Sequence, residues 1–309
     1  MVVMVESIID PDLPISADGT VYHLACTGKQ LADKFILVGD PGRVSTVAQH
    51  FDANSIEFRG NHREIHIITG KFQGVRISVI STGMGTDNME IILNEIHALK
   101  EYNSQTKKWL SEEERQPSKI HLIRVGTSGS PLPTIQVGTL GITKHALGLD
   151  NTCRYYSNPK PSPASVIELE KFANSTELGK IGTYASMAHP EVTQALTKAA
   201  QDYDYVVGTT VSCSGFYGCQ GRAIGQFREH LAIPNIIEIL GIIPEIINIE
   251  MENSALCFLS DMLGYKAGTV CAIIGRRSGA TREFVTPEQA EQSIQNAITV
   301  GLNALLALE

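Results

Sequence analysis

The chain has 309 residues and a formal net charge of −8, with 43% hydrophobic and 19% charged residues. An acidic protein without a basic stripe is not expected to bind nucleic acid, and no apolar stretch is long enough to suggest a membrane span. There is no signal peptide pattern, and the six cysteines lack zinc-type spacing, so we expect a soluble, cytoplasmic protein without a metal.

The first 19 residues are expected to form an extended lead-in, followed by a single domain over residues 20–309. Residues 35–38 predict a short buried strand. The turn after it, Gly39-Asp40-Pro41-Gly42-Arg43, leads into a short helix, and a helix N-terminus behind a tight turn favours an anion. A plain turn remains the simpler interpretation unless a second cationic turn converges on it.

Residues 64–69 and 75–81 read as the two strands of a hairpin. The helix after it has one apolar face, formed by Met89, Ile92, Leu93, Ile96 and Leu99. Residues 103–119 are polar and charged. We expect a solvated surface excursion there, with some helix.

Residues 120–125 form an apolar run that is too short for a helix, which predicts a strand buried on both faces. The run stops in Gly126-Thr127-Ser128-Gly129, and ligands of open α/β sheets bind beyond such strand ends. Arg124 lies inside the run, where an unpaired guanidinium would be costly. Its partner is either a carboxylate of the protein or a bound anion.

The rest of the chain alternates strands with helices. Strands are expected at residues 139–149, 181–185, 205–212, 246–250 and 266–274, and helices at 164–173, 190–203 and 251–263. A capping box at Thr286-Pro287-Glu288-Gln289 begins a last helix with a buried stripe of Ile294, Ile298, Leu302 and Leu305. This order predicts a three-layer αβα sandwich on a mixed, largely parallel twisted sheet.

Two groups of side chains have the chemistry of a ligand site. Arg43, Arg63 and Arg124 follow or approach strand ends, and guanidinium groups bind phosphate oxygens in pairs. Gly39 and Thr127 add N–H and hydroxyl donors to this group.

A second group is suited to a nucleoside. Gln220 and Arg222 beside Phe216 suit a flat heterocycle with carbonyl oxygens, and Glu252 could bridge two sugar hydroxyls. Taken singly, Glu252 is more often a carboxylate at a helix start, and Gln220 is more often an ordinary loop residue.

Six motifs stand in one order along almost the whole chain: Val21-Tyr22-His23-Leu24, Gly39-Asp40-Pro41-Gly42-Arg43, His62-Arg63-Glu64, Arg124-Val125-Gly126-Thr127-Ser128-Gly129, Phe216-Tyr217-Gly218-Cys219-Gln220-Gly221-Arg222 and Glu250-Met251-Glu252. Together they resemble the uridine phosphorylases of the nucleoside phosphorylase superfamily. The resemblance implies the fold of that superfamily and the reversible phosphorolysis of uridine to uracil and ribose 1-phosphate. It implies no cofactor, because inorganic phosphate is a co-substrate, and a homodimer with shared active sites.

The resemblance also implies a role for each site residue. Phosphate would be held by Gly39, Arg43, Arg124 and Thr127, and by Arg63 of the neighbouring subunit. Uracil would be held by Phe216, Gln220 and Arg222, and ribose by Thr127, Met251, Glu252 and the neighbour's His23. The catalytic set implied is Arg124, Gln220, Arg222 and Glu252.

Two alternatives remain. A purine nucleoside phosphorylase or nucleosidase on the same fold is disfavoured by Gln220, Arg222 and the absence of an aspartate at the end of the last strand, Ile273-Ile274-Gly275-Arg276-Arg277. A nucleoside-binding protein without catalysis is disfavoured by the full set of arginines. Residues 103–119 and 236–247 depart from compact bacterial members of the family.

Overall fold

The sheet at the centre of the molecule has eleven strands within the residues that the computed structural model describes, 11–279 and 281–309. In chain order they are β1 (Lys34–Val38), β2 (Phe58–His62), β3 (Ile65–Phe72), β4 (Val75–Ser81), β7 (His121–Ser130), β8 (Leu140–Leu149), β9 (Tyr184–Met187), β10 (Tyr205–Cys213), β11 (Ile246–Glu250), β12 (Lys266–Ser278) and β13 (Thr281–Phe284). The helices are α1 (Pro41–Ala48), α2 (Thr86–Glu101), α3 (Ala164–Ser175), α4 (Pro190–Ala199), α5 (Ile236–Gly241), α6 (Asn253–Leu263) and α7 (Pro287–Ala307).

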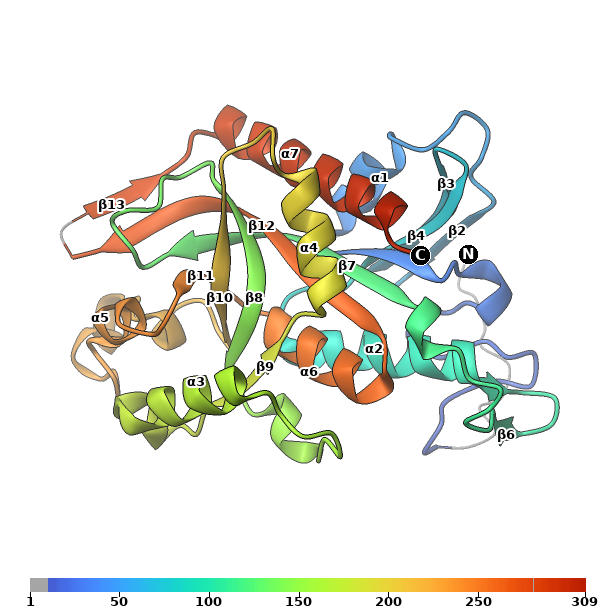
Figure 1. Ribbon diagram of the computed structural model, residues 1–309, viewed down its shortest axis with the longest axis horizontal. Helices are drawn as coiled ribbons and strands as arrows, with labels where there is room; N and C mark the ends of the chain where they lie inside the picture. The colour runs from blue at the N-terminus through green and yellow to red at the C-terminus, as the bar shows by residue number, and fades with distance from the viewer. Residues whose placement is uncertain (1–10, 280) are drawn as a thin grey trace.

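The helices cover both faces of this sheet (Figure 1). α1, α4 and α7 pack on one face, where they share a hydrophobic core with β1, β4, β7, β8 and β12. α2 and α6 pack on the other face against β1, β3 and β4. The three-layer αβα sandwich predicted from the sequence is therefore confirmed.

The strand order brings distant segments together along β7. β7 runs parallel to both β1 and β12, and its Gly129 also pairs with Ile249 of β11. β12 in turn pairs with β8, β8 with β10, and β10 with β11. Together with the pairing of β11 and β7, these contacts close the strands into a ring. The sheet is mixed as predicted, but this closure was not foreseen.

β7 is longer than the sequence suggested. We expected the strand to stop before Gly126, yet it continues to Ser130 because the backbone of its glycine-rich end pairs with β12. β12 likewise runs four residues beyond the predicted end and turns back as β13, which was not predicted. β2 was also missed, since its sequence, Phe58-Arg59-Gly60-Asn61-His62, has no buried apolar face.

Residues 103–119 differ most from the prediction. No α-helix forms in this described segment, which begins with a small hairpin of β5 (Tyr102–Asn103) and β6 (Lys108–Trp109) and ends in a 3-10 turn at Pro117–Lys119. Asn103 closes the hairpin turn by accepting hydrogen bonds from two backbone N–H groups. The charges are not all solvated, because Arg115 forms an ion pair with Glu101 of α2.

Local signals explain where two helices begin. Asp40 caps α1 by accepting a hydrogen bond from Gly42 N at 2.9 Å, with Pro41 at the first helical position. The capping box predicted for α7 is present, with Thr286 Oγ1 accepting from Gln289 N. Other boundaries shift slightly: β9 begins at Tyr184 rather than at residue 181, after Gly182 in a left-handed conformation (φ +71°).

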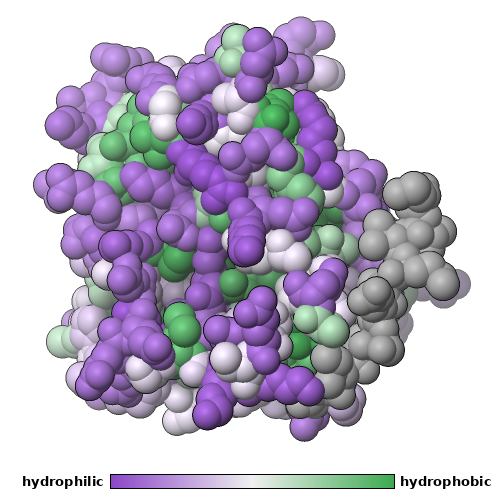
Figure 2. Space-filling view, turned by 90° about the vertical axis from the view of Figure 1, so that its right-hand side faces the viewer, coloured by the Kyte–Doolittle hydropathy of each residue, from purple (hydrophilic) through white to green (hydrophobic). Residues whose placement is uncertain are grey.

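One face of the molecule is mostly polar (Figure 2). Figure 2 shows the side near β6, β2 and β3, where apolar side chains are scattered in small groups among polar ones. In the described ranges, no helix combines the length and the apolar character that a membrane crossing needs. Of the predicted lead-in, residues 1–10 lie outside the described ranges, and residues 11–19 are tied to the domain by buried Ile15, which pairs with Val21.

Candidate active site

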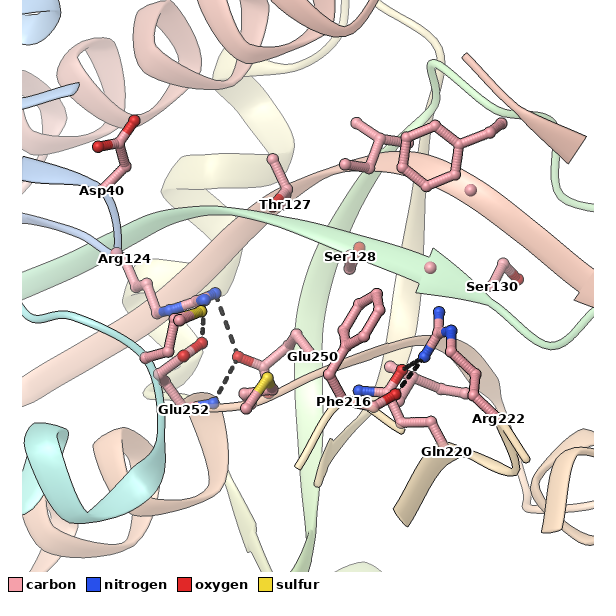
Figure 3. A pocket seen from close by; sticks show the side chains of 18 of the residues that line it. Asp40, Arg124, Thr127, Ser128, Ser130, Phe216, Gln220, Arg222, Glu250 and Glu252 are labelled. Atoms are coloured by element: carbon pink, nitrogen blue, oxygen red, sulfur yellow. Dashed lines mark hydrogen bonds and ion pairs between the residues drawn. The ribbon is translucent and has the colours of Figure 1, made fainter. Parts of the chain in front are cut away.

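A cavity of about 710 Å³ lies along β7, where the ends of β1, β4, β10, β11 and β12 meet. It is lined by nine of the predicted site residues: Gly39, Arg43, Arg124, Thr127, Phe216, Gln220, Arg222, Met251 and Glu252. Figure 3 shows two groups in it: Arg124 with Glu250 and Glu252 at one end, and Phe216 with Gln220 and Arg222 at the other. The cavity therefore joins the two ligand-binding groups that the sequence suggested.

Arg124 is 4% exposed and lies between two carboxylates. Its guanidinium forms ion pairs with Glu250, at 3.1 Å, and with Glu252. Burial alone would lower the pKa of Arg124, but these carboxylates outweigh it and raise the pKa above its ordinary value. The carboxylate alternative from the sequence is thus present, yet Arg124 Nε has no partner among the described residues, which leaves a donor for a bound anion.

Gly126 makes room for this arrangement. A Cβ atom at this position would lie 2.3 Å from Arg124 Nη1, far inside van der Waals contact. The guanidinium therefore folds back over the glycine, and any side chain there would displace it. A glycine two residues after the buried arginine is therefore a steric requirement of the site.

Arg43 reaches the same end of the cavity from α1. Its Nη1 donates to Val125 O at 3.3 Å, and burial together with the nearby Arg124 lowers the pKa of Arg43. Two guanidinium groups that disfavour each other's charge would be stabilised by an anion. With Gly39 and Thr127 also in the lining, this end has the donors that a phosphate needs.

His23 and Arg63 do not line this cavity. Arg63 Nη2 donates to the hydroxyl of Tyr22 at 2.9 Å, with its guanidinium 5.2 Å from the centre of that ring. His23 Nδ1 lies 2.7 Å from a carboxylate oxygen of Glu95 on α2. Both residues are held in place at a distance from their own site, and their contribution to a neighbour's site stays a prediction.

Glu252 and Glu250 come from the junction of β11 and α6. Glu252 accepts a hydrogen bond from Gly85 N at 2.8 Å, so one of its oxygens is fixed from a third element. Glu250 accepts from Ser212 and from the N–H groups of Glu252 and Asn253. Burial raises the pKa of Glu250 to about 7, with Arg124 acting in the opposite direction.

The loop after β10 carries the second group. The guanidinium of Arg222 stacks on Phe216, 3.8 Å from the ring centre, and donates to Phe216 O and to the side-chain oxygen of Gln220. Gln220 Nε2 donates to Gly215 O at 3.2 Å. Burial, and then the charge of Arg277, lowers the pKa of Arg222 to about 10, so Arg222 stays protonated at neutral pH.

Several lining residues were not assigned to the site from the sequence. Glu250 is a charged residue at the end of an apolar strand, β11, and that signal could have identified it. Arg276, Arg277 and Phe284 lie beyond the predicted end of the last strand, on the hairpin of β12 and β13. In the described part of the chain, no group of three or more His, Cys, Asp or Glu residues is placed to hold a metal ion.

Known proteins are similar to this chain in sequence and in fold. A model of the phosphorylase superfamily matches residues 34–308. A uridine phosphorylase of Thermococcus kodakarensis is 32% identical over 296 residues, covering 94% of this chain and 89% of that protein. A guanosine phosphorylase of Halorubrum lacusprofundi is 24% identical, covering 93% of this chain and 98% of its own. A Trypanosoma brucei nucleoside phosphorylase whose crystal structure shows uridine phosphorylase activity superposes with a TM-score of 0.91 at 42% identity, covering 96% of this chain and 100% of that one.

Proposed function

This chain belongs to the phosphorylase superfamily, and we propose that it is a uridine phosphorylase, a pentosyltransferase that reversibly converts uridine and phosphate to uracil and ribose 1-phosphate. The observation that carries the proposal is the pair of groups at opposite ends of one cavity. Arg43 and Arg124 offer charged donors at one end, and Gln220 and Arg222 offer an amide and a guanidinium beside Phe216 at the other.

The proposed reaction uses phosphate itself as the nucleophile. A phosphate oxygen forms a bond to C1′ of the ribose while the bond from C1′ to N1 of uracil breaks, and its electron pair moves into the base. The protein has to align phosphate beneath the sugar and stabilise the negative charge that grows on the uracil oxygens. Arg222 and Gln220 are the donors for that charge, and Glu252 and Met251 in the same cavity lining would hold the ribose.

The assembly and the location are part of the same proposal. We place His23 and Arg63 in the active site of the second subunit of a homodimer, which is supported by their fixed positions outside their own cavity. A cytoplasmic location is supported by the cysteines, all six of which are free thiols and five of them buried. The proposed reaction involves no cofactor.

The alternative assignment is a phosphorylase that acts on purine nucleosides instead of uridine. A guanosine phosphorylase is among the related proteins, at lower identity than the uridine phosphorylase of Thermococcus kodakarensis. The donors of Gln220 and Arg222 favour uracil, and Glu283, a carboxylate on β13 that also lines the cavity, is paired with Arg276.

Ultraviolet detection of uracil tests the proposal directly. The purified protein is incubated with uridine, with and without phosphate, and with inosine and guanosine in parallel. We expect uracil release that depends on phosphate, and little release of purine bases. Release of uracil without phosphate would instead identify a nucleosidase, a preference for purine nucleosides would overturn the base assignment, and no release at all would favour a binding protein.

A further inference from the structure

We propose that Arg277 is a positioning residue for uracil recognition, which holds the loop carrying Gln220 and Arg222 onto the sheet and keeps a positive charge beside the departing base. The inference rests on the proposed function, because it concerns the same end of the cavity. Arg277 lies near the end of β12, and the loop follows β10.

The contacts of Arg277 meet the loop at its recognition turn. Its Nη1 donates to Gln220 O at 2.7 Å, and its Nη2 donates to Gly221 O at 3.1 Å. Gly221 has a left-handed conformation (φ +66°) that reverses the chain between the two recognition side chains. The two carbonyls fixed by Arg277 are therefore those that set the directions of Gln220 and Arg222.

The other hydrogen bonds of residues 214–222 stay within the loop. Backbone N–H groups of Gln220, Gly221 and Arg222 donate to carbonyls of residues 217 and 218. The side chains of Gln220 and Arg222 bond to carbonyls of residues 215 and 216. Among the described hydrogen bonds, those of Arg277 are thus the ones that connect this turn to the sheet.

Arg277 also differs from its neighbour in charge balance. Arg276 forms an ion pair with Glu283, whereas Arg277 has no ion pair with a carboxylate among the residues described. Its charge is felt at Arg222, whose pKa it lowers after burial, and the charged groups that act on Arg277 itself are Arg282 and Glu238. A pair of guanidinium groups without a carboxylate in ion-pair contact favours an anion over a neutral ligand.

These two contributions act at different stages of the reaction. The hydrogen bonds place the donors for neutral uracil in bound uridine, so their loss should raise KM for uridine. The positive charge acts on the base only as it becomes negative, so its loss should lower kcat. Arg277→Gln keeps an amide donor without the charge, and Arg277→Ala removes both.

Steady-state kinetics of the two variants test the proposal. For Arg277→Gln we expect kcat to fall on the order of tenfold with little change in KM for uridine, and for Arg277→Ala a further rise of roughly tenfold in KM. KM for phosphate should stay within about twofold in both, because the phosphate end is not touched. Arg59→Ala, which removes an exposed arginine of β2 outside the cavity lining, serves as the matched control and should behave as wild type.

Three results would overturn the role of Arg277. One is wild-type kinetics for uridine in Arg277→Ala, and another is a rise in KM for phosphate equal to that for uridine, which indicates a general loss of structure. If Arg277→Ala does not fold, unchanged kcat in Arg277→Gln is the third. Wild-type uracil release is measured in the same assay, so failure of the proposed function shows in the wild type and failure of this inference shows in the variants alone.

Discussion

Gly126 is a residue whose missing side chain determines the position of a charged one. The Arg124 guanidinium occupies the space that a Cβ atom would need, and it does so between Glu250 and Glu252. In the sequence, Gly126 looks like part of a polar loop. In the structure it lies in the middle of β7, beneath the guanidinium of Arg124.

Gly126→Ala should therefore impair catalysis without unfolding the protein. The methyl group forces the guanidinium away from its two carboxylates, and a displacement of about 1 Å in such a site costs on the order of a hundredfold in rate. The measurement is kcat/KM for phosphate, with the circular dichroism spectrum and melting temperature as controls. Unchanged kinetics in a folded variant would mean that the position of Arg124 does not matter for phosphate use.

At this scale the sequence predicted residue types better than residue partners. Arg124 was recognised as a buried cation that needs an anion, but the choice between protein and ligand could not be made. The structure shows the protein partners, while a bound anion at Arg124 stays a prediction. These partners, Glu250 and Glu252, are more than 120 positions away in the chain, and only the ring of strands brings them close. Arg277 was missed for the same reason, since its partners are carbonyl groups of another loop.

At the scale of elements, the charged segment 103–119 is attached to the end of α2. Glu101, which is 4% exposed, accepts hydrogen bonds from Arg115 of the excursion and from the hydroxyl of Tyr265. Burial alone would raise the pKa of Glu101, but hydrogen bonds from His97, Arg115 and Tyr265 outweigh it and lower the pKa to about 2. His97 in turn stacks on Trp109 of the small hairpin, with ring centres 4.7 Å apart.

Glu101→Gln should make the free energy of unfolding depend less on pH in the acid range. The depressed pKa gives the folded state an advantage that is complete above the ordinary value of 4.5 and is lost as the pH falls toward about 2. We expect the variant to be less stable by about 2 kcal/mol at pH 7 and the difference to shrink as the pH is lowered. Urea unfolding at a series of pH values measures it, and Glu113→Gln, an exposed acid of the same segment, is the control. A constant difference at all pH values would contradict the assignment.

Elements with a local signal were predicted well, and elements formed by distant partners were not. α7 has its cap, its proline and its apolar stripe within one stretch of sequence, and all three are present. The excursion at 103–119 has charged residues that suggested some helix. Arg115 instead forms an ion pair with α2, and Trp109 stacks on a histidine of α2. β13 forms by pairing with the part of β12 that continues beyond its apolar residues, so the sequence of β13 alone does not predict it.

At the scale of the whole molecule, the proposed shared site makes a prediction about mixed subunits. Arg63→Ala and Arg222→Ala should each be nearly inactive, the latter because one lost donor to the developing anion costs on the order of a hundredfold. In a mixed dimer, one site would receive Arg222 from one subunit and Arg63 from the other, and would be intact. With equal amounts and random exchange, roughly a quarter of wild-type activity should return.

The matched control for this experiment mixes two variants whose changed residues belong to the same subunit's part of the site. Arg43 and Arg222 both line the cavity of their own chain, so Arg43→Ala with Arg222→Ala should restore nothing. Arg124→Ala is a poor choice for the purpose, because it would leave two buried carboxylates without their cation. If Arg63 with Arg222 also restores nothing after confirmed exchange, the site belongs to one chain.

The ring of strands around β7 also has a consequence for the order of folding. Gly126 of β7 pairs with Cys271 of β12, and Gly129 pairs with Ile249 of β11, so the cavity is closed by contacts between residues more than 100 positions apart. Such non-local contacts form slowly, because a long loop must close before they are made. During synthesis, β7 leaves the ribosome with Arg124 long before its carboxylates exist. The nascent chain thus has an incomplete binding site until nearly the whole sequence is made, and the site is completed among the last steps of folding.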